Sequence, residues 1–338
     1  MKYRMDQDTK RAFIVTTVFS FISIAAVLVS LNTGSLKIPP VKVIQTFLGQ
    51  GDFQSSTVLF VYRLPRIVIT MLAGVGLGIS GAILQGLSRN PLADSGILGL
   101  HAGAALGLII FVTFFHSMDE NASLFIPLFT FGGGALTALL ILLLAYDPYR
   151  GILPIRLILV GIAISAGISA ITLFFSLRLN EETYNFASRW LVGNVWGRDW
   201  IHVIALLPWI LILAPFSWIK SKTLNALSLG DDIASGIGVS VGKNRLLLLA
   251  TAVGLSCASV AMAGGIGFIG LVAPHLARRL AGPMYQHFLP LSGLIGLIIL
   301  VLADTIGRSI FQPNAIPAGI VVAATGTPYF LYLLAKTK

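Results

Sequence analysis

Cysteine and charge are the two features that this sequence has least of. The 338 residues include one cysteine, Cys257, and only 11% of them are charged. A single cysteine excludes an intrachain disulfide framework, and its place inside an apolar run predicts a small buried side chain. So little charge excludes an ordinary soluble protein, in which about a quarter of the residues are charged.

Motifs for catalysis and for metal or nucleotide binding are missing as well. His275 has no second His, Cys or carboxylate at ligand spacing, which favours a structural hydrogen bond over a metal site. The segment GIGVSVGK at 236–243 is glycine-rich, but Ile237 and Asn244 stand where a phosphate loop needs Gly and Ser or Thr. The sequence also has no HExxH motif, which argues against a membrane-embedded enzyme. If ATP drives this protein, another subunit must bind the ATP and its Mg²⁺, and we expect no cofactor on this chain.

Long apolar runs fill most of the chain. Hydrophobic residues make up 56% of it, more than one core of this length can bury, so the bilayer must act as the solvent. We expect one transmembrane domain over 1–338, an all-α polytopic membrane protein with about ten helices of roughly 20 residues each. The apolar runs lie near 12–31, 66–87, 97–116, 124–145, 154–177, 201–219, 246–263 and 288–303, with weaker ones near 266–277 and 317–335.

Lys and Arg are distributed unevenly between the joins of these runs. Of the 23 in the chain, 15 fall in the joins predicted to lie inside and eight in those predicted to lie outside. This excess predicts that both termini are cytoplasmic and that the protein lies in the cytoplasmic membrane. The formal net charge of +10 then needs no nucleic acid, because anionic lipid headgroups account for it.

The apolar runs themselves contain almost no Asp, Glu, Lys or Arg. An ion-coupled secondary transporter places ionisable groups near mid-membrane, so this alternative is the weaker one. Asp304, near the end of a run, precedes Arg308 by four residues, and this spacing predicts that the two side chains pair.

The segment GAILQGLSRNPLADSGILG, residues 81–99, is the most specific of the chain. We expect an apolar helix to break at Asn90-Pro91, and Asp94 and Ser95 to cap the next one. The corner between them would lie on the inner side. Before it, small residues recur every four positions, which allows another helix of the chain or of a second subunit to approach closely. These small residues are Gly74, Gly78, Ala82 and Gly86.

This corner resembles the signature of the FecCD-type permeases, the membrane subunits of ATP-driven importers for iron–siderophore complexes, haem and vitamin B12. Gln85, Asn90, Pro91 and Asp94 match the family pattern, whereas Ser95 stands where the family usually has proline. Three further segments are similar to the family, so the resemblance extends over most of the chain. They are RWLVGNVWGRDW at 189–200, AGGIGFIGLVAPHLAR at 263–278 and IPAGIVVAATGTPYFLYLL at 316–334.

The resemblance implies a type II ABC importer permease fold and a transport subunit that is not an enzyme. The function it implies is import of iron(III)–siderophore by alternating access, with hydroxamates as the first expectation and vitamin B12 or haem as the alternatives. The partners would be a second permease subunit, two ATP-binding subunits inside and a substrate-binding protein outside. By the same resemblance, the fifth and tenth spans line the path, and an inner gate lies at Tyr149, Arg150 and Gly151.

The longest inner join, about 220–245, is polar enough to form structure in water. We expect a short helix from about Asp231 to Ser235, followed by a glycine break. In the family, a pattern similar to LGDDIASGIGV docks into a groove on the ATPase; a solvated loop with two acids is the alternative. The coupling residues that this resemblance implies are Leu229, Gly230, Asp231, Asp232, Ala234 and Gly238.

Three arginines lie on the predicted outer side, where arginine is depleted. Arg63 and Arg66 in RLPR are three residues apart, which predicts a paired patch that points outward, and Arg308 is the third. Such cations suit carboxylates of a docking protein, because arginine binds a carboxylate in a bidentate, charge-assisted manner. In the family, equivalent arginines pair with glutamates of the substrate-binding protein. The alternative is that they extend to lipid headgroups.

Overall fold

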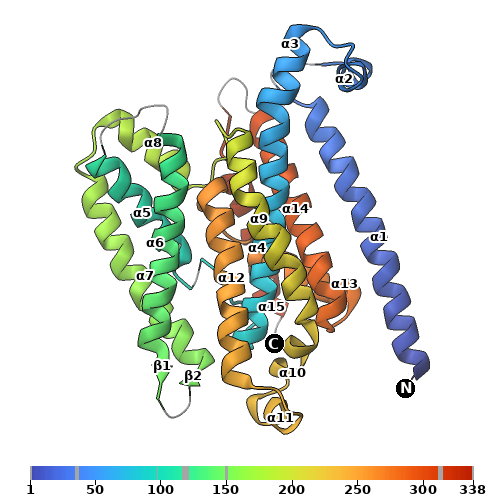
Figure 1. Cartoon of the computed structure of the whole chain (residues 1–338), viewed down its shortest axis with the longest axis vertical. Helices are drawn as coiled ribbons and strands as arrows, with labels where there is room; N and C mark the ends of the chain where they lie inside the picture. The colour runs from blue at the N-terminus through green and yellow to red at the C-terminus, as the bar shows by residue number, and fades with distance from the viewer. Residues whose placement is uncertain are drawn as a thin grey trace.

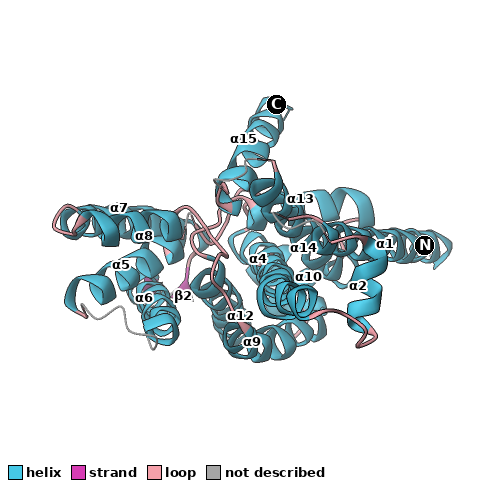
Figure 2. Cartoon of the chain, turned by 90° about the horizontal axis from the view of Figure 1, so that it is seen from above, coloured by secondary structure: helices cyan, strands magenta, loops and turns pink. Residues whose placement is uncertain are grey.

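The chain folds into a bundle of helices, seen along its length in Figure 1 and end-on in Figure 2. The computed structural model describes residues 2–34, 38–96, 98–115, 122–148, 151–310 and 315–336. The longer helices are α1 (Lys2–Asn32), α4 (Leu64–Ser88), α5 (Leu100–Phe114), α6 (Ala122–Ala145), α7 (Pro154–Ser176), α9 (Trp200–Ile219), α12 (Val241–Ala263), α13 (Ile269–Ala281), α14 (Tyr285–Ser309) and α15 (Ala318–Lys336). The shorter elements are α2 (Pro40–Phe47), α3 (Phe53–Ser56), the π-helical η1 (Thr57–Arg63), α8 (Glu181–Leu191), α10 (Ser221–Ser228), α11 (Asp231–Gly236), β1 (Tyr146–Asp147) and β2 (Gly151–Ile152).

Seven of the described helices are long and apolar enough to cross a membrane. They are Asp8–Asn32, Phe53–Ser88, Phe125–Ala145, Pro154–Ser176, Trp200–Ile219, Val241–Ala263 and Tyr285–Ser309. Two shorter apolar helices, Leu100–Phe114 and Ala318–Tyr332, and the 13-residue α13 occupy the other three predicted runs. All ten runs are therefore helical, and a multi-pass helical membrane protein is confirmed, while the count of ten spans stays a prediction.

The only strands of the described residues form a small antiparallel ribbon, in which Tyr146 pairs with Ile152 and Asp147 with Gly151. Each strand has two residues, too few to give an alternating sequence pattern, so the sequence predicts no strand here. The ribbon joins α6 to α7 at one end of the bundle (Figure 1).

Different elements lie at the two ends of the bundle. Elements α2, α3 and α8 lie at the top of Figure 1, and we call this the α2 end. The N-terminus, the ribbon, α10 and α11 lie at the bottom, which we call the α11 end. The joins predicted to be inside thus gather at one end, and those predicted to be outside gather at the other.

Helices α4, α12 and α14 form the interior of the bundle. Most of each is buried within the chain, whereas less than a third of α1, α6, α7 and α9 is buried. Cys257 in α12 is 1% exposed, which confirms its predicted place in the core. Hydrogen bonds between side chain and backbone cross this interior, such as the 2.8 Å bond that Ser80 Oγ of α4 donates to Ala252 O of α12.

The stripe of small residues on α4 packs against α14 of the same chain. A methyl group on Gly74 would lie 2.5 Å from Gly296 O, and one on Gly78 would overlap Ser292 O. Only residues without a side chain allow this approach of the two backbones. Of the two interpretations of the stripe, the structure therefore shows packing within the chain.

The corner after α4 differs from its prediction in one respect. Helix α4 ends at Ser88, Arg89 adopts a left-handed backbone with φ of 51°, and Asn90 Oδ1 accepts a 2.9 Å bond from Leu92 N. Helix α5, however, begins only at Leu100, and no side chain caps it. The predicted cap by Asp94 and Ser95 is wrong because turns follow these residues, and the Asp94 carboxylate is buried against α13 instead.

Candidate functional site

Three arginines that are far apart in sequence meet at the α2 end. Arg63 ends η1, Arg66 lies in the first turn of α4, and Arg308 lies in the last turn of α14. Gly34, just after α1, touches two of them, since a methyl group there would lie 2.8 Å from Arg63 Nη2 and 3.1 Å from Arg308 Nη1. We call Arg63, Arg66, Arg308 and Asp304 the arginine cluster.

Asp304 is the only acid of the cluster. Arg66 binds it through Nε, 3.0 Å from both carboxylate oxygens, and through Nη2, 2.7 Å from Oδ1. Arg308 Nε lies 3.5 Å from Oδ2, which confirms the pair that the four-residue spacing predicts. The four side chains of the cluster thus carry three positive charges and one negative charge, a formal excess of two positive charges.

The other partners of the cluster are backbone carbonyls at the end of α1. Arg63 Nη1 donates a 2.7 Å bond to Leu31 O, and Arg308 donates to Thr33 O and Ser30 O. The last carbonyls of a helix lack partners within it, and its dipole favours a cation there. The two arginines therefore bind the C-terminal end of α1 to α4 and α14.

This arrangement corrects the predicted orientation of the arginines. Arg63 is 6% exposed, and the side chain of Arg66 is 15% exposed, so the two do not form an outward pair. The spacing does bring the two side chains into one cluster, but the Leu31 carbonyl binds Arg63 and the Asp304 carboxylate binds Arg66 within the molecule instead of leaving them exposed. The role of the cluster in docking stays a prediction.

At the α11 end, a glycine lies on either side of α11. Gly230 before it and Gly238 after it have φ of 127° and 85°, where a side chain would be strained. The helix Asp231–Gly236 confirms the predicted short helix and glycine break. Asp231 and Asp232 occupy its first turn, where the helix dipole favours negative charge.

Asp231 is held by two arginines from other elements. Arg245 of α12 donates two hydrogen bonds to it, from Nη2 to Oδ1 at 2.6 Å and from Nη1 to Oδ2 at 3.1 Å. Arg89 also donates to Oδ1. Burial raises the pKa of Asp231, but the hydrogen bonds and charges of Arg245 and Arg89 outweigh it, so the pKa lies below the ordinary carboxylate value. Asp231 therefore remains ionised at neutral pH.

The residues around α11 divide into buried and exposed ones. Ala234 is fully buried, so it supports α11 from within. Leu229, Ile233 and Ile237 are 64%, 52% and 64% exposed. Sequence reasoning missed Ile233 and Ile237, although their spacing of four residues is typical of one side of a helix.

Only part of the predicted inner gate can be placed. Tyr149 and Arg150 lie outside the described residues. Gly151 lies in β2 with φ of 69°, and the next residue, Ile152, accepts a 2.9 Å bond from Arg245 Nη1 at its carbonyl. The corner residues lie at the same end of α4, where Gln85 Nε2 donates to Gly270 O of α13 at 3.2 Å.

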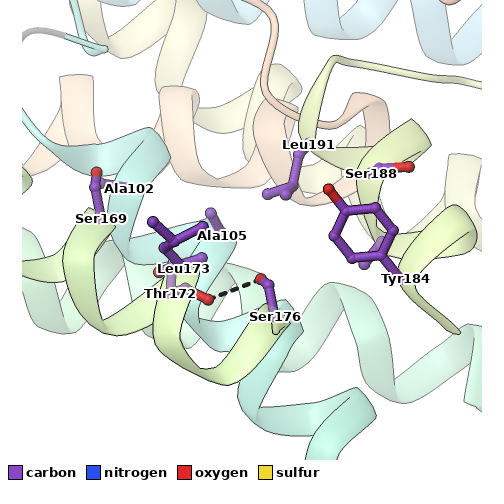
Figure 3. A pocket seen from close by; sticks show the side chains of 10 residues that line it. Ala102, Ala105, Ser169, Thr172, Leu173, Ser176, Tyr184, Ser188 and Leu191 are labelled. Atoms are coloured by element: carbon purple, nitrogen blue, oxygen red, sulfur yellow. Dashed lines mark hydrogen bonds between the residues drawn. The ribbon is translucent and has the colours of Figure 1, made fainter. Parts of the chain in front are cut away.

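A cavity of about 290 Å³ lies between α5, α7 and α8 near the α2 end, and Figure 3 shows its lining. Hydroxyl groups and small apolar side chains surround it, and the Ser176 hydroxyl there donates to Thr172 O at 2.7 Å. The lining residues are Ala102, Ala105, Ser169, Thr172, Leu173, Ser176, Tyr184, Ala187, Ser188 and Leu191. None of them is charged, so the cavity lacks strong ligands for a bare metal ion.

Metal ligands do not gather anywhere in the described part of the chain, since no three His, Cys, Asp or Glu residues lie together there. His275 stands edge-on to the ring of Tyr329, 6.1 Å between centroids, which joins α13 to α15. The predicted structural hydrogen bond is wrong for Nε2, which is buried without a hydrogen-bond partner among the described residues, so this ring contact takes its place.

Apolar helices that pack through glycines, with charged networks at both ends, define a multi-pass membrane protein of the permease kind. A family model described as the FecCD transport family matches residues 22–336. The chain belongs to this family.

Several named proteins are similar to this chain over nearly its whole length. The iron(3+)-hydroxamate import system permease protein FhuG of Bacillus subtilis (strain 168) is 44% identical, over 99% of this chain and all of that protein. The Fe(3+) dicitrate transport system permease protein FecD of Escherichia coli (strain K12) is 34% identical, over 96% of this chain and 99% of that protein. A solved structure described as an inward-facing conformation of a metal-chelate type ABC transporter has a TM-score of 0.84 at 29% identity, covering 95% of this chain and 99% of that one.

Proposed function

We propose that this chain is the permease subunit of an ATP-driven importer for iron(III)–siderophores of the hydroxamate class. The observation that carries the proposal is the 44% identity with FhuG, which extends over essentially the full length of both proteins. The helix bundle supports it, because its interior is neutral apart from paired groups and suits a passage rather than a catalytic site.

The importer would contain a second permease subunit, two ATP-binding subunits at the α11 end and a substrate-binding protein at the α2 end. All ten apolar runs would span the cytoplasmic membrane, with the α11 end and both termini in the cytoplasm. Helices α7 and α15 would line the path between the two permease subunits. The exposed side chains of α7 agree with this, among them Leu159 and Leu173, each 62% exposed.

Helix α11 would bind the ATPase through Leu229, Ile233 and Ile237. These side chains are exposed at an end of the bundle that lies in water, where apolar side chains without a partner are unfavourable. Asp232 is exposed beside them and can meet a basic residue of the ATPase. Asp231 and Ala234 would hold α11 in place from behind, and Gly230 and Gly238 would permit the turns on either side.

The arginine cluster would attract the substrate-binding protein. Its two excess positive charges lie at the end that faces that protein, and they would favour carboxylates on its surface. Since the guanidinium groups are mostly buried, the attraction acts through the field of the cluster and through the exposed part of Arg66.

Reconstitution with different cargoes tests the function. The permease and ATPase are placed in vesicles with ATP, and uptake of radioactive ferric hydroxamate is measured with the binding protein present. Uptake that needs ATP and is blocked by excess ferric hydroxamate, and not by haem or vitamin B12, is the expected result. Uptake of haem or vitamin B12 in its place would overturn the assignment of cargo.

A further inference from the structure

Asp231 is the point where four elements of the α11 end are joined. It opens α11, receives Arg245 from α12 and Arg89 from the end of α4, and reaches β2 through Arg245. We propose that Arg245 is a positioning residue of the transport cycle, which makes α11, the ribbon and the start of α7 move as one body. This inference rests on the proposed function, because it assumes that an ATPase moves α11.

The geometry of Arg245 suits this role. Nη1 donates to Ile152 O at 2.9 Å and to Asp231 Oδ2 at 3.1 Å, so one nitrogen connects the ribbon to α11. Nη2 adds the 2.6 Å bond to Asp231 Oδ1. The guanidinium is planar and rigid, and Arg245 is 5% exposed, so its partners cannot shift far without breaking these bonds.

The second arginine extends the same body to the corner. Arg89 donates to Asp231, and its Nε donates to Leu227 O of α10 at 3.2 Å. It occupies the left-handed position that ends α4, directly before Asn90. A displacement of α11 therefore acts on the ribbon through Arg245 and on the corner through Arg89.

A cavity between the corner and the start of α7 leaves room for this motion. A cavity of about 530 Å³ separates the end of α4 from the first two turns of α7. It is lined by Ser88, Arg89, Asn90, Pro154, Ile155, Ile158 and Leu159. The start of α7 is thus not packed tightly against the corner, and at this end the bond from Arg245 to Ile152 ties the ribbon to α12 and α11.

If Arg245 only stabilised the fold, its loss would not change the amount of iron taken up per ATP hydrolysed. We compare Arg245→Gln with Lys243→Gln, which removes the same charge from an exposed residue two positions away on α12. The complete transporter is reconstituted with its ATPase, the binding protein and ferric hydroxamate. Three quantities are measured: ATPase bound per permease, ATP hydrolysed and iron taken up.

In Arg245→Gln, we expect the ATPase to remain bound and ATP hydrolysis to continue, while iron taken up per ATP falls about ten-fold. Lys243→Gln should match the native ratio. Arg245→Lys should recover part of the ratio, because it keeps the charge but not the rigid fork. An unchanged ratio in Arg245→Gln, or loss of uptake only in proportion to lost ATPase, would overturn the inference.

A distance measurement on the native network covers the case in which the variant does not fold. Spin labels at Ser235 on α11 and Tyr146 on β1 are introduced with Cys257 replaced by alanine. The distance between the labels should stay the same when ATP is added, because the two elements move together. A distance that changes with ATP would contradict the inference. If the native complex takes up no ferric hydroxamate, the proposed function fails; if only the coupling results fail, the function stands.

Discussion

At the scale of single residues, each charged group of the arginine cluster is bound by an opposite charge or by a backbone carbonyl. Asp304 is 2% exposed and lies between Arg66 and Arg308, which come from different helices. Arg63 and Arg308 use their remaining donors on the last carbonyls of α1. Removing one member leaves buried partners without a counter-charge, so the cost exceeds what the contact itself contributes.

Asp304→Asn should therefore destabilise the protein strongly. We expect a loss of about 3–5 kcal/mol, the usual result of breaking a buried ion pair on one side. Arg156→Gln is the control, since it breaks the exposed pair with Asp147 and should cost about 0–1 kcal/mol. Thermal unfolding in detergent measures both variants, and equal shifts would contradict the role given to Asp304.

Arg63→Gln tests whether the cluster attracts the binding protein. Glutamine is shorter than arginine and does not reach Leu31 O as Nη1 does, so the change removes the charge together with this bond. We expect weaker binding of the substrate-binding protein at low salt and a smaller effect of salt on that binding. Arg178→Gln removes charge from an exposed arginine near the start of α8, outside the cluster, and serves as the control. Binding that is unchanged at all salt concentrations would exclude the docking role.

Residue contacts could be predicted from the sequence only where they are local. The spacing of Asp304 and Arg308 predicted their pair correctly. The bond from Arg66 to the same carboxylate joins residues 238 positions apart, and no spacing rule covers it. The same holds for Arg245, Arg89 and Asp231, which only the folded bundle brings together.

At the scale of helices, close packing of α4 holds the interior. Gly81 faces the backbone of Gly270 on α13, where an added methyl group would overlap the carbonyl. Gly81→Ala should cost about 1–3 kcal/mol, as overpacking does, because two backbones must move apart. Gly132→Ala in α6 is the matched control, with nothing within 4 Å, and should stabilise by about 0.5–1 kcal/mol. Thermal unfolding separates the two, and a neutral Gly81→Ala would contradict this packing.

The exposed side chains around α11 give a second prediction for an element. Leu229→Ser should weaken ATPase binding about ten-fold or more, because burial of a leucine contributes about 1.5–3 kcal/mol. Leu143→Ser is the control, since that leucine is 66% exposed and belongs to α6 rather than to the segment around α11. Co-purification of the ATPase with each variant measures the effect. Equal retention by both variants would remove α11 from the interface.

Helices could be predicted well because apolar runs of this length leave few other structures in a bilayer. Their ends could not. The start of α5 was expected at Asp94 and Ser95, and tertiary burial of Asp94 displaced it to Leu100. The bond from Arg63 to Leu31 O, which accompanies the burial of Arg63, has no sequence signature either.

At the scale of the whole molecule, the proposed function requires that a separate ATPase supplies the energy. Buried charges in the described helices are few, and those of the arginine cluster are bound to each other or to backbone. The chain alone in vesicles should therefore accumulate no ferric hydroxamate when given only a proton or sodium gradient. Uptake should begin when the ATPase, ATP and the binding protein are added, and accumulation driven by either gradient alone would contradict this picture.

The sequence predicted which joins share an end of the molecule, because Lys and Arg mark one side. It did not predict that α11, the ribbon and the corner would be linked through Asp231 and Arg245. That arrangement depends on how α4, α10 and α12 pack, and no single segment of the sequence predicts this packing.

The uninterrupted helical stretch from Phe53 to Ser88 has a consequence of its own. Its 36 residues extend about 54 Å, whereas the hydrocarbon of a bilayer is about 30 Å thick. Arg63 and Arg66 lie near its beginning, and Arg89 follows its last residue. In a bilayer, this continuous helical backbone would extend beyond the hydrocarbon, so a tilt of one end would displace the other end through the backbone itself.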